Sequence, residues 1–157
     1  MAIPYRGNTG LGSYFITSAS YQKISVFQTD KMAGLFLDVL FRYRDQRKYL
    51  LHEFVIMPDH VHLLLTPTDT IERAIQLIKG GFSYRAKKEL GYSGEIWETS
   101  FYDRRIRDWK EYCQFREYIY LNPVKARLSD TPEEYRHSSA AGGFELDALP
   151  QRLKPAS

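Results

Sequence analysis

Several features that would place the sequence in a familiar class of protein are scarce or missing. The chain has one cysteine, Cys113, which excludes an internal disulfide and a zinc site built on a cysteine cluster. It lacks the His-Glu-x-x-His pattern of metalloproteases. No apolar run approaches the roughly 20 residues that cross a bilayer, and the N-terminus lacks the pattern of a signal peptide. We therefore expect a soluble protein of a reducing cytoplasm.

Charge is modest in sum and uneven in distribution. The net charge is +3, but residues 73–127 contain 12 basic against 7 acidic residues, whereas the segments before and after have no basic excess. This middle segment also contains aromatic residues, and cations with aromatic rings can bind phosphates and stack on unpaired bases. A solvated helix face is the alternative, because surface helices are often rich in lysine and arginine. Charge alone favours that alternative.

Strands are predicted by β-prone runs bounded by turn residues. A tight turn at Pro58-Asp59 should join the second and third strands into a hairpin. The four expected strands cover residues 14–17, 49–57, 61–66 and 101–106.

Helices are predicted by apolar residues at three- and four-residue spacing, over 31–46 with Asp30 as N-cap and over 70–90. Gly80-Gly81 in the second helix indicates either a kink or the close approach of another element. Asp108 and Glu111 form a capping-box-like start of a third helix, which Asn122-Pro123 should end near Leu121.

The order β-α-β-β-α-β with an additional C-terminal helix is that of an α+β, ferredoxin-like (RRM-like) sandwich, whose helices pack on one face of a sheet. With 43% hydrophobic residues, the chain can bury a continuous core without disulfides. We expect one domain over residues 1–157, with a core at about 13–140 and a loose tail at about 141–157.

His60 and His62 flank Val61 at the start of a predicted strand. Side chains alternate along a strand, so both imidazoles should project from one face, about 7 Å apart at the backbone, where they can chelate one ion. Val61, Leu63 and Leu65 would then point into the core on the other face. Alone, such a pair is more often solvent-facing or hydrogen-bonded than metal-binding, and a metal would need a third donor.

Tyr118 and Asn122 lie one turn apart on the third predicted helix, so a phenol and an amide oxygen should project together. The phenol is a potential nucleophile and the amide a potential metal ligand. Spacing alone leaves Tyr118 as a boundary aromatic, Asn122 as a helix stop, and Tyr120 as a rival placed nearer the core.

Four segments in this order, "HEFVIMPDHVHLLLTP", "IKGGFSYRAKKELG", "EIWETSFYDRRIRD" and "REYIYLNPVKARL", resemble the REP-associated tyrosine transposases, relatives of the single-tyrosine HUH transposases of insertion sequences. The resemblance spans roughly Tyr14 to Ala140. It implies that His60 and His62 are metal ligands, Tyr118 the catalytic nucleophile and Asn122 the third ligand. Better-known relatives have Gln at the last position, and Asn has the same amide oxygen on a shorter arm.

The resemblance further implies a bacterial single-stranded-DNA endonuclease and strand transferase that uses Mg²⁺ or Mn²⁺, forms a 5′-phosphotyrosine and recognises hairpin-forming palindromic repeats, as a monomer or homodimer. Some cation must help to deprotonate the phenol, and the candidates are the metal, Lys125 and Arg104 or Arg105. Basic residues that could contact DNA phosphates are Lys79, Lys87, Lys88, Arg104, Arg105, Arg107 and Lys125.

Two other functions are compatible with parts of the pattern. A catalytically inactive module that binds single-stranded nucleic acid could have the same fold, although His60, His62 and Leu64 occupy a strand face where an RRM domain has stacking aromatics. A hydrolytic metallophosphoesterase would need more carboxylate ligands than the sequence displays.

Overall fold

Four antiparallel strands form a sheet in the computed structural model, which describes residues 12–155. The strand order is β2-β3-β1-β4, so β1 and β3 are central and β2 and β4 lie at the edges. The strands are β1 (Tyr14–Ala19), β2 (Tyr49–Met57), β3 (His60–Pro67) and β4 (Tyr102–Arg105). The four predicted strands and the Pro58-Asp59 turn are confirmed.

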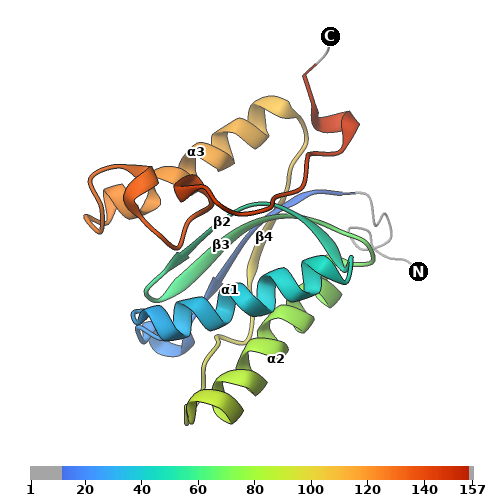
Figure 1. Ribbon diagram of the computed structural model, residues 1–157. Helices are drawn as coiled ribbons and strands as arrows, with labels where there is room; N and C mark the ends of the chain where they lie inside the picture. The colour runs from blue at the N-terminus through green and yellow to red at the C-terminus, as the bar shows by residue number, and fades with distance from the viewer. Residues whose placement is uncertain (1–11, 156–157) are drawn as a thin grey trace.

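The helices are α1 (Asp30–Asp45), α2 (Ile71–Leu90) and α3 (Trp109–Lys125), with short 3₁₀ turns η2 (Tyr21–Lys23), η3 (Pro132–Glu134), η4 (Ser139–Ala141) and η5 (Gln151–Leu153). Figure 1 shows α1 and α2 below the sheet and α3 above it. The predicted α+β, ferredoxin-like order is confirmed, but the expectation of helices on one face holds only for α1 and α2. The reason is that alternate residues of the strands are apolar on both faces, so both faces need a cover.

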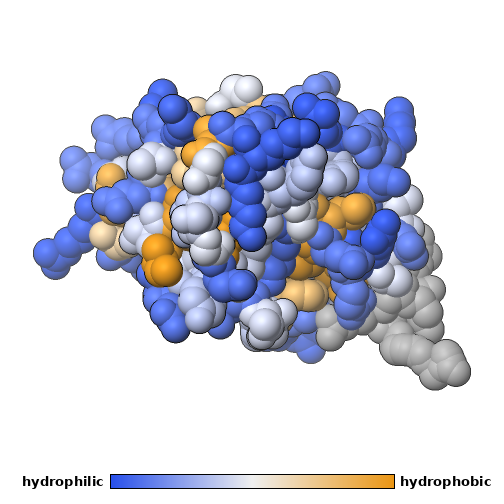
Figure 2. All heavy atoms as spheres, turned by 90° about the horizontal axis from the view of Figure 1, so that it is seen from below, coloured by the Kyte–Doolittle hydropathy of each residue, from blue (hydrophilic) through white to orange (hydrophobic). Residues whose placement is uncertain are grey.

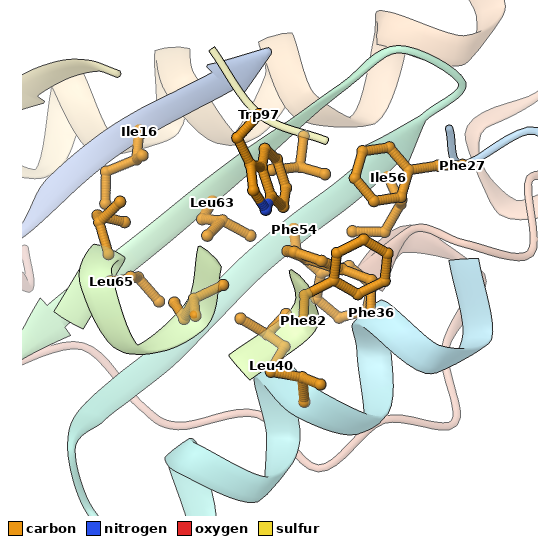
Figure 3. Close-up of a cluster of buried hydrophobic side chains, with 14 of the residues drawn as sticks. Ile16, Phe27, Phe36, Leu40, Phe54, Ile56, Leu63, Leu65, Phe82 and Trp97 are labelled. Atoms are coloured by element: carbon orange, nitrogen blue, oxygen red, sulfur yellow. The ribbon is translucent and has the colours of Figure 1, made fainter. Parts of the chain in front are cut away.

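The core between the sheet and α1 and α2 is the larger of the two apolar clusters (Figure 3). Phe54 and Leu63 from the sheet meet Phe36 and Phe82 from the helices, and all four are at most 1% exposed. Burial of one such side chain contributes about 1.5–3 kcal/mol. This cluster fixes the register of the strands, because a slip by one residue would turn these side chains to the opposite face.

Gly81 allows α1 and α2 to approach each other. A Cβ at Gly81 would lie 2.9 Å from the Tyr43 ring and 3.3 Å from Val39, whereas a Cβ at Gly80 would meet nothing within 4 Å. The close approach considered for the glycine pair is therefore real at Gly81, and α2 continues through both residues.

Two helix ends differ from the prediction. Thr29, and not Asp30, is the N-cap of α1, since its hydroxyl accepts from Met32 N–H at 3.2 Å. Helix α3 continues through Pro123 to Lys125. Pro123 removes one N–H donor, but the last turn is closed by later residues, as Ala126 N–H donates to the Asn122 carbonyl at 3.0 Å.

The prediction of a loose tail at 141–157 is wrong for residues 141–155; residues 156–157 lie outside the described part. The Asp147 carboxylate accepts from Arg44 at 2.8 and 3.0 Å, and the Asp147 N–H donates to the Leu51 carbonyl at 2.8 Å. Phe144 packs edge-on against Phe54, and Leu153 is buried on the α3 side. The segment is ordered because it completes hydrogen bonds along the β2 edge.

The outer surface is mostly polar on the side of α1 and α2. Viewed from below, Figure 2 shows hydrophilic residues interrupted by separate hydrophobic patches. Within residues 12–155, no helix combines the length and apolar character that a membrane span requires.

Candidate active site

The histidine pair lies at the start of β3, on the face that α3 covers. Val61, Leu63 and Leu65 belong to the core below the sheet, and Leu64 belongs to the cluster under α3, so the alternation expected for this strand is confirmed. The rings of His60 and His62 have centroids 4.7 Å apart. The strand therefore presents two imidazoles together, as the spacing predicted.

His62 has one ring nitrogen engaged and one without a partner. Its Nδ1 lies 2.8 Å from the Thr17 hydroxyl on β1, whereas its Nε2 is buried and has no hydrogen-bond partner among the described residues. Burial, with a smaller contribution from His60, lowers the pKa of His62 to about 3. The ring is therefore neutral at physiological pH, and with the proton on Nδ1 the Nε2 lone pair is available to a ligand.

His60 is oriented by its neighbour in the turn. Its Nδ1 lies 2.7 Å from a carboxylate oxygen of Asp59. Histidine ligands of metals typically donate the N–H of the second ring nitrogen to an oxygen acceptor, often a carboxylate. Asp59 and Thr17 supply such partners to His60 and His62 respectively.

Tyr118 reaches the same place from α3. Its ring centroid lies 5.2 Å from that of His62, with the rings at 74°, and 5.8 Å from that of Phe15. The side chain is 45% exposed, so its hydroxyl is accessible to a large substrate. Tyr120 points elsewhere, since its hydroxyl donates to Glu53 at 2.8 Å. The structure thus places Tyr118, and not Tyr120, beside His62.

A cavity of about 570 Å³ opens beside Tyr118 and His62. Its base is Phe15, which stacks between His62 at 5.4 Å and Phe115 at 4.5 Å. Neither His60 nor Asn122 lines it. The lining residues are Phe15, Thr17, His62, Tyr102, Arg104, Glu111, Gln114, Phe115 and Tyr118.

The donor set fits a divalent cation in part. The buried Nε2 of His62 has no hydrogen-bond partner among the described residues, which suits a nitrogen that binds a metal ion, and His60 lies beside it. Within residues 12–155, no group of three or more His, Cys, Asp or Glu side chains is placed to hold an ion. A third protein donor would therefore be an amide or hydroxyl, and Asn122 lies partly buried one turn beyond Tyr118.

Comparison with known proteins decides the family. A family model described as "Transposase IS200 like" matches residues 12–120, which include the whole sheet, the histidine pair and Tyr118. The chain belongs to the IS200-like transposase family. An Escherichia coli K12 protein named "REP-associated tyrosine transposase" is 26% identical over 140 residues, which are 85% of this chain and 81% of that protein.

A solved structure supports the fold of this IS200-like transposase. It is titled "Structure of the REP associates tyrosine transposase bound to a REP hairpin", and it superposes with a TM-score of 0.71 at 20% identity, covering 100% of this chain and 90% of the other. The resemblance drawn from the four sequence segments is thereby confirmed.

The structure divides the predicted basic residues of the transposase between the two sides of the sheet. Helix α2 carries Lys79, Lys87 and Lys88 on one side, and Lys79 donates to the Glu98 carbonyl at 2.8 Å. Arg104 and Lys125 lie on the α3 side, and Arg107 joins Glu111 there. Arg105 pairs with Tyr14, whose side chain is in the core between the sheet and α1 and α2, so alternation directs Arg105 to that side. The seven residues do not form one surface.

Sequence reasoning gave no role to several residues that build the cavity. Phe15 and Thr17 are two residues apart on β1, so their side chains lie on one face of the sheet, which is also the face of His62. The sequence could indicate this only if the pairing of β1 with β3 were known. Glu111 was predicted only as part of the start of the third helix, and Gln114, which also lines the cavity, received no role.

Proposed function

We propose that this transposase cleaves and rejoins single-stranded DNA, with Tyr118 as the nucleophile. The observation that carries the proposal is an exposed phenol 5.2 Å, ring to ring, from a buried imidazole whose Nε2 has no partner. An accessible hydroxyl next to a potential metal ligand is the arrangement expected for nucleophilic attack on a phosphodiester.

The reaction has two balanced steps. The Tyr118 oxygen loses its proton to a base and attacks phosphorus, the P–O3′ bond breaks, and the departing oxygen takes a proton to become a 3′-hydroxyl. The 5′-phosphotyrosine conserves the energy of the broken bond, so a 3′-hydroxyl can later attack it and release Tyr118. We propose His60, His62 and Asn122 as ligands of Mg²⁺ or Mn²⁺; when bound, such an ion would polarise the phosphate.

We propose a DNA hairpin formed by a palindromic repeat as the substrate. The proposal rests on the name of the Escherichia coli relative and on the REP hairpin in the similar solved structure. A flexible single strand next to the hairpin could enter the cavity beside Tyr118, and basic side chains outside it could contact phosphates of the folded part.

The test is a cleavage assay on hairpin DNA with a single-stranded flank, with and without Mg²⁺ or Mn²⁺. We expect a protein–DNA adduct that resists denaturation in the wild type and in Tyr84→Phe, and none in Tyr118→Phe. Tyr84 is a matched control because it is an exposed tyrosine on α2, across the sheet. An adduct that persists in Tyr118→Phe would disprove the proposed nucleophile.

The same assay separates the alternatives. Tight binding of the hairpin without an adduct, in the wild type and with every ion, would indicate an inactive binding module. Cleaved DNA with no protein attached would indicate a hydrolase, against which the lack of a carboxylate cluster within residues 12–155 already argues.

A further inference from the structure

A buried carboxylate on the wall of the cavity needs an explanation. Glu111 lies two helical turns before Tyr118 on the same side of α3, and both residues line the cavity. Its side chain is 8% exposed. DNA carries a negative charge at each phosphate, so an uncompensated carboxylate here would repel the substrate.

Two arginines compensate the negative charge of Glu111. Arg104 donates from Nη2 to Glu111 Oε2 at 3.1 Å, and Arg107 donates to the same oxygen at 3.0 Å from Nη2 and to Oε1 at 2.8 Å from its backbone N–H. Although burial alone would raise it, the hydrogen bonds from Arg107 and the charges of both arginines lower the pKa of Glu111. The cluster therefore has one positive charge in excess.

The excess charge faces the cavity through Arg104. Arg104 pairs with Phe15 across the β1–β4 ladder, and its guanidinium lies over the Phe115 ring at 5.9 Å from the centroid. Its hydrogen bond to Glu111 uses one nitrogen of the guanidinium fork, so other N–H groups can donate to a second acceptor. Arg107 does not line the cavity, and its side chain is 74% exposed.

We propose that Arg104 binds the scissile phosphate or the phosphate next to it, and that Glu111 is a positioning residue that holds the guanidinium against the Phe115 ring. The proposal deepens the proposed function, because it names the contact that brings DNA to Tyr118. Arginine suits this role, since its planar fork can donate to a carboxylate and a phosphate at once.

The test is binding of hairpin DNA in which one phosphate at a time around the cleavage site is replaced by an uncharged methylphosphonate, measured in a Tyr118→Phe background that blocks reaction. We expect one position at which replacement weakens binding by about 10- to 100-fold, well beyond the other positions. In Arg104→Gln this positional excess should disappear. In Arg105→Gln, which removes the same charge from the adjacent residue on the other side of the sheet, the excess should remain.

Glu111→Gln separates positioning from charge. It removes a negative charge, so overall affinity should stay equal or rise, whereas the positional excess should fall because Arg104 is no longer held. A purely structural role for Glu111 would weaken binding at all positions alike, and unfolding midpoints measured in parallel would report it.

Two results would overturn the inference: an Arg104→Gln protein with the same positional excess as its parent, or a scan with no excess at any position. The adduct assay on the Tyr118-containing protein keeps the two proposals apart. Adduct formation with a flat scan refutes the Arg104 contact alone, and a clear positional excess without any adduct refutes the cleavage chemistry alone.

Discussion

Removal of a single hydroxyl tests how α3, the helix that carries Tyr118, is fixed to the sheet. The Glu53 carboxylate on β2 is 8% exposed and accepts from Tyr120 at 2.8 Å, from Ser139 at 2.7 Å and from Tyr112 at 3.4 Å. Tyr112 and Tyr120 both belong to α3. Their replacement by phenylalanine deletes only the hydroxyl, so each variant isolates one hydrogen bond.

Distance and burial rank the two tyrosines in opposite orders. Tyr112 is the more buried residue, at 4% exposure, so burial alone predicts the larger loss of stability for Tyr112→Phe. The Tyr112–Glu53 distance is beyond the usual range for an O–H···O bond, whereas the Tyr120–Glu53 distance is typical of a strong one. Hydrogen bonds to charged groups contribute about 1.5–3 kcal/mol. We therefore expect Tyr120→Phe to cost about 1.5–3 kcal/mol and Tyr112→Phe less than about 1 kcal/mol.

Urea unfolding of the two variants and the wild type measures these free energies, with the slope m checked for constancy. The wild type, Tyr112→Phe and Tyr120→Phe should also be compared for adduct formation, since a tilted α3 would move Tyr118 away from His62. Equal losses, or a larger loss for Tyr112→Phe, would refute the view that the Glu53 hydrogen bonds, and not buried area, hold α3.

Three further predictions follow from other parts of the fold. Burial lowers the pKa of His52 below 6.5, so as the pH falls the unfolded chain binds a proton before the folded protein does. The free energy of unfolding should therefore be highest above about pH 6.5 and fall below it. His52→Gln should reduce the difference in unfolding free energy between about pH 7.5 and 5.5. Asp147→Ala should speed hydrogen exchange in residues 141–155, and unchanged exchange there would contradict the described packing. Gly80→Ala should stabilise α2 by about 0.5–1 kcal/mol in thermal unfolding, whereas Gly81→Ala should gain less or lose, because the Tyr43 ring must move.

The sequence was sufficient for features that depend on local periodicity. Alternation along β3 placed His60 and His62 on one face and Val61, Leu63 and Leu65 on the other, and helical spacing placed Tyr118 and Asn122 one turn apart. Both patterns act over a few residues, so no knowledge of the tertiary fold was needed.

Features that depend on contacts between distant segments could not be predicted in this way. The face on which α3 packs is decided by Phe15, Val55 and Leu64, which come from three strands. Arg104 and Arg105 are equivalent in a charge pattern, and only the pairing of β4 with β1 separates them. The sequence pattern predicted a loose tail at 141–157 because Arg44 and Leu51, the partners of Asp147, lie about a hundred residues earlier in the chain.

Residues 137–147 also cover the backbone edge of β2. Strand β2 is an edge of the sheet, and its unpaired backbone groups would be a template for a strand from another copy. His137, Ser139 and Asp147 occupy backbone groups of Ile56, Phe54 and Leu51 along that edge. A chain shortened before residue 137 would therefore be expected to aggregate through β2 even if the sheet and Tyr118 remained folded.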